Sequence, residues 1–472
     1  MKKAAAPTSA SVQAAFGLFD DDSSDEEFHA EPQQPAVPVN LVEQLKISAP
    51  PAPAVKQTAT STSVSSASSN RVLYPAWRDV APEFVGPIEV DNNCANIGGS
   101  RGYVATRDLA PGTLVLVEKA YVPWPMDVDQ SDPSFFIVTV RNILREPSWK
   151  ITVEHLGYLH PQRLEDLPAE LLTAGREKYD AQLAALLKEP EVAALGVSHD
   201  TLLQNVFAMQ CNAFDSGVFL HNAIFNHECN PNCIKFTPED RERGVSEVRV
   251  ARAVKKGEPL TISYLYPREQ SRNRRLRNLR EQFGFVCICA LCRRGDSVLP
   301  RPTRHAEKGG AAGDEPTLAT IEEVEQVAAG AEELLKDGTS AAHVLSIALE
   351  ALSDALEVVA HDHVVLMRIH KLVADCCDAI LRARPSQDVR EYAILFLRSS
   401  YELLELQRMY LNDDHIDLAR TLNDVSQGIE LLLSLDPKAL LQEFPEWKDF
   451  RQASKVENEY RLEYRRIKRL YE

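Results

Sequence analysis

The sequence has little positive charge, few cysteines and no long apolar run. Its 472 residues include 52 Lys and Arg against 69 Asp and Glu, a formal net charge of −17, which argues against strong nucleic-acid binding through phosphate neutralisation. Nine unevenly placed cysteines are too few for a disulfide framework and indicate a reducing compartment. No apolar run approaches the roughly 18 residues of a membrane span, and the N-terminal MKKAAAPTSA lacks the apolar stretch of a secretory signal. These absences predict a soluble protein of the cytoplasm or nucleus that binds no membrane.

Composition divides the chain into four parts. Residues 1–84 are rich in Ala, Pro, Ser and Thr and bury too little apolar surface to offset the entropy of ordering, so a disordered acidic tail is expected. Residues 85–295 mix strand and helix patterns, and residues 296–316 are typical of a flexible linker. Residues 317–472 are almost entirely helical in pattern. We therefore expect an α+β domain followed by a helical one.

Local patterns refine this division. β-branched and apolar runs predict strands at 102–106 and 113–118, joined by a turn at Ala110-Pro-Gly, and again at 245–254 and 259–266. Between them, residues 133–204 have helical spacing. In the C-terminal part, apolar stripes predict an array of antiparallel helix pairs that resembles tetratricopeptide helices.

Three cysteines close together indicate a metal site. Cys287, Cys289 and Cys292 form a C-x-C-x2-C group whose thiolates could share one tetrahedral zinc ion. A structural site needs a fourth ligand, which Cys229 or Cys233 could supply by folding back. The alternative is that these thiols are small buried side chains, but three at this spacing favour zinc.

The cysteine group completes a series of motifs that resembles a known family. In order, the chain has G-G-S-R-G at 98–102, N-H-E-C-N-P-N at 226–232, G-E-P-L-T-I-S-Y at 257–264 and the cysteine tail. Together they resemble a SET-domain protein-lysine methyltransferase of the SMYD-type branch. The resemblance implies a β-rich SET domain at 85–295, with a helical insert at about 126–204 and a post-SET zinc tail at 285–295. Residues 125–204 contain no cysteine, so the zinc-binding MYND finger of that branch is missing.

The resemblance also implies the chemistry, which is methyl transfer from S-adenosylmethionine to a lysine ε-amine. Tyr264 matches the catalytic tyrosine, and Tyr266 would assist it from the same strand face. Phe207 and Phe283 match the aromatic walls of the lysine channel. A dry channel would favour the neutral amine, because desolvation disfavours the ammonium form.

Cofactor and zinc ligands follow from the same comparison. Cys229 becomes the fourth zinc ligand beside Cys287, Cys289 and Cys292. Phe285 matches the aromatic residue that stacks on adenine. The remaining residues expected to bind S-adenosylmethionine are Gly99, Arg101, Gly102, Asn205, Asn226 and His227.

Two residues depart from the family pattern. Glu228 stands where relatives usually have Ser, which places a carboxylate beside the cofactor segment. Phe283 stands where many relatives have Tyr, and the space left by the missing hydroxyl predicts that already methylated lysine is accepted.

Two other functional hypotheses compete with the enzyme. One is a catalytically inactive SET-like scaffold that binds a partner through its helical domain. The other is a chromatin-binding module that acts through the arginine-rich segment 268–280, although the net acidic charge argues against it. For the enzyme we expect a protein substrate, a histone or another protein bearing the target lysine, and a monomeric chain.

Overall fold

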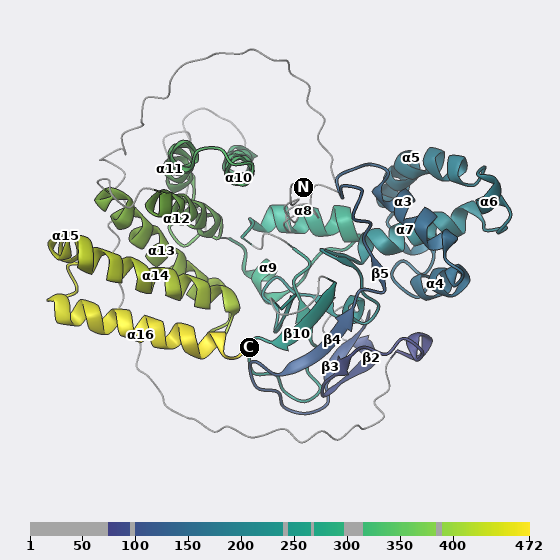
Figure 1. Cartoon of the computed structure of the whole chain (residues 1–472), viewed down its shortest axis with the longest axis horizontal. Helices are drawn as coiled ribbons and strands as arrows, with labels where there is room; N and C mark the ends of the chain where they lie inside the picture. Colours follow the sequence, from purple (N-terminus) through teal and green to yellow (C-terminus); the bar gives the residue numbers. More distant parts are fainter. Residues whose placement is uncertain (1–73, 95–99, 239–243, 266–268, 297–314, 384–388) are drawn as a thin grey trace, which may run out of the picture. The chain divides into compact units, whose positions relative to one another are not determined.

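The structure is a computed structural model that describes residues 74–94, 100–238, 244–265, 269–296, 315–383 and 389–472 (Figure 1). The described residues form two compact units, one within Arg71–Arg268 and Arg272–Arg294 and the other within Glu269–Ser271 and Gly295–Glu472. All strands of the described residues lie in the first unit and the second is helical, which confirms the α+β class with a helical C-terminal part. No helix in the described ranges is both long and apolar enough to cross a membrane. The predicted tail and linker fall almost entirely outside the described residues.

The first unit contains several small sheets rather than one large one. Its largest sheet has the order β1-β4-β10-β9, and the smaller sheets are β2-β3, β8-β11 and β5-β7-β6. The pair β8-β11 is parallel, with Thr261 opposite Asn226 and Ile262 opposite His227. The strands are β1 (Phe84–Val85), β2 (Ile88–Cys94), β3 (Ser100–Ala105), β4 (Leu114–Lys119), β5 (Val122–Pro123), β6 (Ala213–Phe214), β7 (Gly217–Val218), β8 (Asn226–His227), β9 (Cys233–Phe236), β10 (Val245–Val250) and β11 (Thr261–Ile262).

Three of the predicted strands are found as β3, β4 and β10, but the fourth is much shorter than expected. Residues 259–266 were expected to form one strand, and only β11 is regular. The backbone changes partner along this segment, because Leu260 N–H donates to the Tyr103 carbonyl and Tyr264 N–H donates to a side chain of β8. Residues that switch partners in this way cannot continue a single ladder.

The described part of the first unit starts at Tyr74, within the segment that composition assigns to the tail. Pro75–Trp77 form a short 3-10 helix, and the indole of Trp77 is fully buried. Its Nε1–H donates to the His155 carbonyl, so the polar end of the ring is satisfied within the core. Trp77 therefore belongs to the core of the first unit, although it lies before residue 84.

The insert between β5 and β6 is helical, as predicted. Ser198 caps α7 by accepting a hydrogen bond from Thr201 N–H, a normal N-terminal signal. Most side chains of α7 are buried, and the helix contacts its neighbours α3, α4 and α5, as expected for a central helix. The helices are α3 (Phe135–Arg145), α4 (Trp149–Leu156), α5 (Ala169–Leu186), α6 (Pro190–Ala193) and α7 (His199–Cys211), and α8 (Arg272–Phe283) and α9 (Ala290–Arg294) follow the sheets.

The second unit is a succession of helices, most of which pack on the next one along the chain (Figure 1). The pairs α10·α11, α11·α12, α12·α13 and α13·α14 are in contact, and α14 packs on α16. Leu345, Leu349 and Leu352, which recur at helical spacing, are buried on α11. The helices are α10 (Glu315–Lys336), α11 (Ala341–Val358), α12 (Val365–Ala383), α13 (Arg390–Tyr410), α14 (Ile416–Leu435), α15 (Pro437–Glu443) and α16 (Phe450–Lys468).

Candidate active site and zinc centre

Four cysteine sulfurs converge where the chain returns from α8. Cys229 follows β8, and Cys287, Cys289 and Cys292 lie on the tail after α8. Their Sγ atoms all lie within 4.8 Å of one another, and Cys229 Sγ is 3.4 Å from Cys292 Sγ and 3.9 Å from Cys287 Sγ. A zinc ion with Zn–S bonds of about 2.3 Å sets tetrahedral sulfurs about 3.8 Å apart. The four thiols therefore fit a structural zinc site.

Cys233, the other candidate for the fourth zinc ligand, lies in β9 and outside the group of four sulfurs. It pairs with Val250 in the β9-β10 ladder and is fully buried there, where burial raises the pKa of its thiol. Within the group of four cysteines, backbone N–H groups donate to the sulfurs: Cys289 N–H donates to Cys287 Sγ, and Cys292 N–H donates to Cys289 Sγ. Such donors stabilise thiolates.

Tyr264 is fixed at both ends. Its hydroxyl donates to the Phe225 carbonyl across 2.7 Å, and its backbone N–H donates to His227 Nδ1 across 3.0 Å. Burial raises the pKa of the Tyr264 hydroxyl well above its usual value, so the phenol stays protonated at neutral pH. Because that proton is directed to the carbonyl, the lone pairs of the phenol oxygen remain available as hydrogen-bond acceptors.

Aromatic rings surround Tyr264. The Phe283 ring centroid lies 5.1 Å from that of Tyr264, and the Phe285 ring stands at 89° to Tyr264 with centroids 6.3 Å apart. The His227 ring is 5.2 Å from Tyr264 and 5.9 Å from Phe285. These spacings lie within the range of aromatic contacts, and together the four rings form a compact aromatic wall.

This wall borders a cavity of about 830 Å³, a volume suited to a small-molecule ligand. The cavity reaches from the insert to the cysteine tail, and the tail residues Val286 and Ile288 line it with more than half of their surface exposed. The predicted site residues that line it are Arg101, Asn226, His227, Tyr264, Phe283, Phe285, Cys287 and Cys289.

Arg101 brings positive charge to the cavity. Its guanidinium lies 4.5 Å from the Tyr74 ring centroid and 5.6 Å from that of Trp77, and its Nη2 donates to the Tyr158 carbonyl. Its Nη1 is buried and has no hydrogen-bond partner within the described residues. A buried donor left without a partner is costly, so this group suits an anionic ligand in the cavity.

Asn226 and Gly102 pack against each other beside the cavity. Asn226 Nδ2 donates to the Arg101 carbonyl across 2.8 Å. A Cβ atom on residue 102 would lie 2.4 Å from the same nitrogen, so only glycine allows this approach. Gly102 therefore does not line the cavity but allows Asn226, which does, to approach the backbone of β3.

Two carboxylates, those of Glu228 and Glu258, also line the cavity. Thr261 Oγ1 donates to the Glu228 carboxylate across 3.2 Å, and the Arg252 guanidinium pairs with Glu258 across 2.8 Å. Burial raises the pKa of Glu228. Burial also lowers the pKa of the His227 ring to about 3, which keeps the imidazole neutral.

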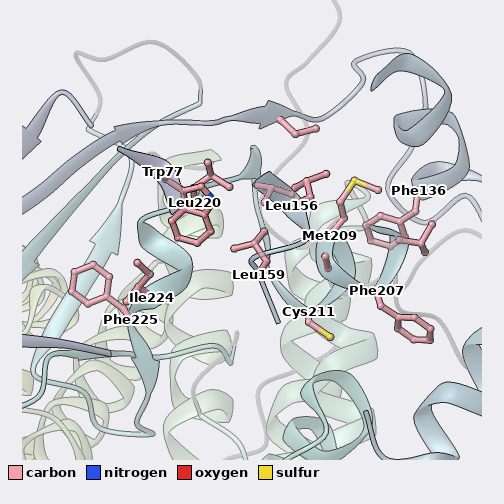
Figure 2. Close-up of a cluster of buried hydrophobic side chains, with 14 of the residues drawn as sticks. Trp77, Phe136, Leu156, Leu159, Phe207, Met209, Cys211, Leu220, Ile224 and Phe225 are labelled. Atoms are coloured by element: carbon pink, nitrogen blue, oxygen red, sulfur yellow. The ribbon is translucent and has the colours of Figure 1, made fainter. Parts of the chain in front are cut away.

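Besides Gly102, two other expected residues do not line the cavity. The Phe207 ring is fully buried on α7, where a Cβ on Gly175 of α5 would lie 2.1 Å from its Cζ. Figure 2 shows Phe207 at the opposite side of the core cluster from Phe225, the residue whose carbonyl binds Tyr264. Asn205 Nδ2 donates to the Thr201 carbonyl of the preceding turn, and its side chain lies within the core. The expected roles of Phe207 and Asn205 are thus corrected, because α7 is a structural helix.

Asn212 and His160 are among the residues that line the cavity but were not predicted from the sequence. Asn212, at the C-terminal end of α7, donates to the carbonyls of His160 and Ala208. The same Asn-x-Phe spacing that directed attention to Asn205 recurs at Asn212-Ala-Phe214, so a signal existed. His160 comes from the loop after α4 and belongs to no motif. Gly99 and Tyr266 lie outside the described residues, and their expected roles remain predictions.

Comparison with known proteins finds a SET domain in the part of the chain that contains Tyr264. The model of the SET domain family matches residues 100–265, a range that includes β3 to β11 and Tyr264. Histone-lysine N-methyltransferase SET5 of Meyerozyma guilliermondii is 32% identical over 139 residues, 29% of this chain and 26% of that protein. Protein-lysine N-trimethyltransferase SMYD5 of Homo sapiens is 34% identical over 125 residues, 26% of each chain.

The matched region is therefore limited, because the chain covers about a quarter of the length of these curated relatives. A protein of Acanthamoeba polyphaga mimivirus named for its SET domain is 24% identical over 203 residues, 42% of this chain and 75% of that protein. The chain thus contains a SET domain, at residues 100–265, and it is similar to SET-domain lysine methyltransferases that include a member of the SMYD type.

Proposed function

We propose that the protein transfers a methyl group from S-adenosylmethionine to the ε-amine of lysine in a protein substrate. One observation carries the proposal: in a chain with a SET domain at residues 100–265, the half-buried Tyr264, with its hydroxyl oriented by the Phe225 carbonyl, lines an aromatic cavity beside four cysteine sulfurs that fit a metal ion. The names of the relatives support lysine as the acceptor.

The chain offers a suitable place for the cofactor. When bound, S-adenosylmethionine supplies an electrophilic methyl group attached to a sulfonium. Arg101, with its buried Nη1, is the group we expect to bind the cofactor's carboxylate, since guanidinium and carboxylate form strong charge-assisted hydrogen bonds. Asn226 through its side chain and His227 through its backbone would bind its polar parts, and Phe285 presents a ring for stacking on adenine.

Tyr264 would orient the lysine amine. Lysine has an ordinary pKa of about 10.4, and the aromatic surroundings of Tyr264 and Phe283 favour the neutral amine, because desolvation penalises the ammonium. The phenol oxygen already donates its proton to Phe225, so its lone pairs accept an N–H from the amine. This contact turns the nitrogen lone pair toward the methyl group, and such positioning supplies much of the rate.

Phe283 would determine how many methyl groups are added. It lines the cavity next to Tyr264 and carries no hydroxyl that could hydrogen-bond to the amine or occupy space beside it. We therefore propose that mono- and dimethyl-lysine are accepted as substrates. The name of the related human protein, a trimethyltransferase, agrees with this proposal.

The zinc site would be structural. The four cysteines would fill every position of a tetrahedral ion and so leave none open for a reacting group. Cys229 and the tail cysteines would then lock the segment that carries Phe285 against β8, and so complete the cavity wall.

The proposal extends to the substrate protein, the compartment and the oligomeric state. We propose a basic protein substrate, a histone or another protein, acting in the cytoplasm or nucleus, and a monomeric enzyme. Carboxylates at the cavity, including Glu228 and Glu258, and the net charge of −17 suit a basic partner.

The test is transfer of a radiolabelled methyl group from S-adenosylmethionine to core histones or to a protein extract. Labelled methyl-lysine, identified by mass spectrometry after hydrolysis, is the expected product. Calorimetric titration with S-adenosylmethionine separates the alternatives, because a scaffold without enzymatic activity would give no binding heat. Cofactor binding with label transferred only to residues other than lysine would overturn the assignment of the acceptor.

A further inference from the structure

The His227 imidazole uses both of its nitrogens, and each faces a different part of the site. Its Nδ1 accepts the backbone N–H of Tyr264 across 3.0 Å. Its Nε2 lies 3.3 Å from Cys229 Sγ, one of the four sulfurs of the metal site. The ring is only 5% exposed, so water competes little for either contact.

These two contacts define the tautomer. A nitrogen that accepts a hydrogen bond carries no proton, so the single proton of the neutral ring resides on Nε2. The Nε2–H therefore donates to the Cys229 sulfur. A donor to a metal-bound thiolate disperses the negative charge of a four-thiolate zinc site, and second-shell donors of this kind orient the ligand they contact.

A buried histidine in this chain need not be connected in this way. His370 on α12 is 3% exposed, and its Nδ1 has no hydrogen-bond partner within the described residues. Burial alone therefore does not impose two contacts on an imidazole. The arrangement at His227 depends on its position between the metal site and Tyr264.

The backbone explains why the ring is needed at Tyr264. The β8-β11 ladder pairs Ile262 with His227, and Glu228 N–H donates to the Ile262 carbonyl. Two residues after Ile262, the N–H of Tyr264 donates to the His227 side chain instead of to a backbone carbonyl. With the hydroxyl bound to Phe225, the tyrosine is fixed by two residues of one short segment.

We propose that His227 is a positioning residue that couples the zinc site to Tyr264, so that loss of the ion loosens the tyrosine as well as the cysteine tail. The catalytic meaning of this coupling rests on the proposed function, whereas the coupling itself is measured without any methyl acceptor.

The test uses the full zinc-loaded chain and two variants. In His227→Asn the amide oxygen can replace Nδ1 as acceptor for Tyr264, but the donor to Cys229 is lost. In His227→Gln the longer amide can still donate to Cys229. Zinc release to excess chelator is followed with a chromogenic indicator, and hydrogen–deuterium exchange of the peptide 260–265 reports on the Tyr264 amide. His370→Asn is the matched control, since that ring is also buried but lies on another unit.

We expect zinc affinity to fall about 10–100-fold in His227→Asn, with faster release, while His227→Gln and His370→Asn stay close to the wild type. In the wild type, removal of zinc should speed exchange at Tyr264, and in His227→Asn this dependence on zinc should be lost. Two results would overturn the coupling. One is that His227→Asn releases zinc at the same rate as the wild type, and the other is that exchange at Tyr264 in the wild type does not change when zinc is removed. Failure of methyl transfer with the coupling intact would instead count against the proposed function alone.

Discussion

The side-chain nitrogen of Asn226 lies 2.4 Å from the point where a Cβ on residue 102 would be. The strands β3 and β8 approach so closely there that the side-chain amide of Asn226 bonds to the Arg101 carbonyl. Glycine at 102 is therefore a requirement of the cofactor side of the site, and the loop before it is not simply flexible.

The variant Gly102→Ala tests this contact. The added methyl should displace Asn226 and break its hydrogen bond, so that the Kd for S-adenosylmethionine rises about tenfold, as expected for loss of one hydrogen bond worth about 1.4 kcal/mol. Calorimetry measures the Kd. Gly330→Ala is the control, because nothing lies within 4 Å of a Cβ on that residue in α10, and it should leave the Kd unchanged. Equal affinities for both variants would argue against the contact.

Zinc content tests the ligand set. Cys289→Ser and Cys229→Ser should reduce bound zinc from one ion per chain to nearly none, because each removes a thiolate from the quartet. Inductively coupled plasma mass spectrometry of the purified chain gives the stoichiometry. Cys233→Ala is the control and should keep its zinc while losing about 1–2 kcal/mol of stability through the cavity it leaves in the core. Zinc lost from Cys233→Ala and retained by Cys229→Ser would reverse the assignment.

Phe283→Tyr tests whether residue 283 determines how many methyl groups are added to lysine. A hydroxyl added next to Tyr264 should hydrogen-bond to the lysine amine and take up space, and so shift the products toward monomethyl-lysine. Mass spectrometry of the methylated peptide gives the distribution. Phe285→Tyr, whose ring is farther from Tyr264, should retain the wild-type distribution. A wild-type enzyme that makes only monomethyl-lysine would contradict the role given to Phe283.

Glu118 predicts a pH dependence of stability. Its buried carboxylate accepts N–H bonds from His221 and Asn222, yet burial raises its pKa from 4.5 to about 7. Between these values the folded chain binds a proton that the unfolded chain has released, so the free energy of unfolding falls as pH rises from 4.5 to 7. Integrated over this interval, the fall is at most about 3 kcal/mol.

Urea unfolding of the wild type and of Glu118→Gln, compared at several pH values, isolates this contribution. The difference between the two should vary through this pH interval, because the amide does not titrate. A constant difference across the interval would show that Glu118 keeps the same charge in both states.

The metal site could be read from the sequence because its ligands are close in the chain or stand in a short motif. Cys287, Cys289 and Cys292 are within six residues, and Cys229 belongs to the N-H-x-C segment. Tyr264 was likewise tied to a strand motif. Such local patterns predict chemistry well, because the spacing itself limits which atoms can meet.

The errors arose where spacing was ambiguous. Asn205-Val-Phe207 and Asn212-Ala-Phe214 have the same pattern, seven residues or about two helical turns apart. Only the position of the end of α7 distinguishes them, since Asn212 is its C-terminal cap and Asn205 lies inside. His160 comes from an irregular loop, where no periodicity predicts which side chain will reach the cavity.

Methyl transfer by Tyr264→Phe tests the central claim most directly. The variant removes only the hydroxyl, which donates to Phe225 and is expected to orient the amine. S-adenosylmethionine should bind with nearly the wild-type Kd by calorimetry, while the rate of labelled methyl transfer to lysine should fall about 10²–10³-fold, as for loss of a preorganised hydrogen-bonding group. Tyr392→Phe on α13 should retain the full rate. An unchanged rate in Tyr264→Phe, measured beside an active wild type, would contradict the account.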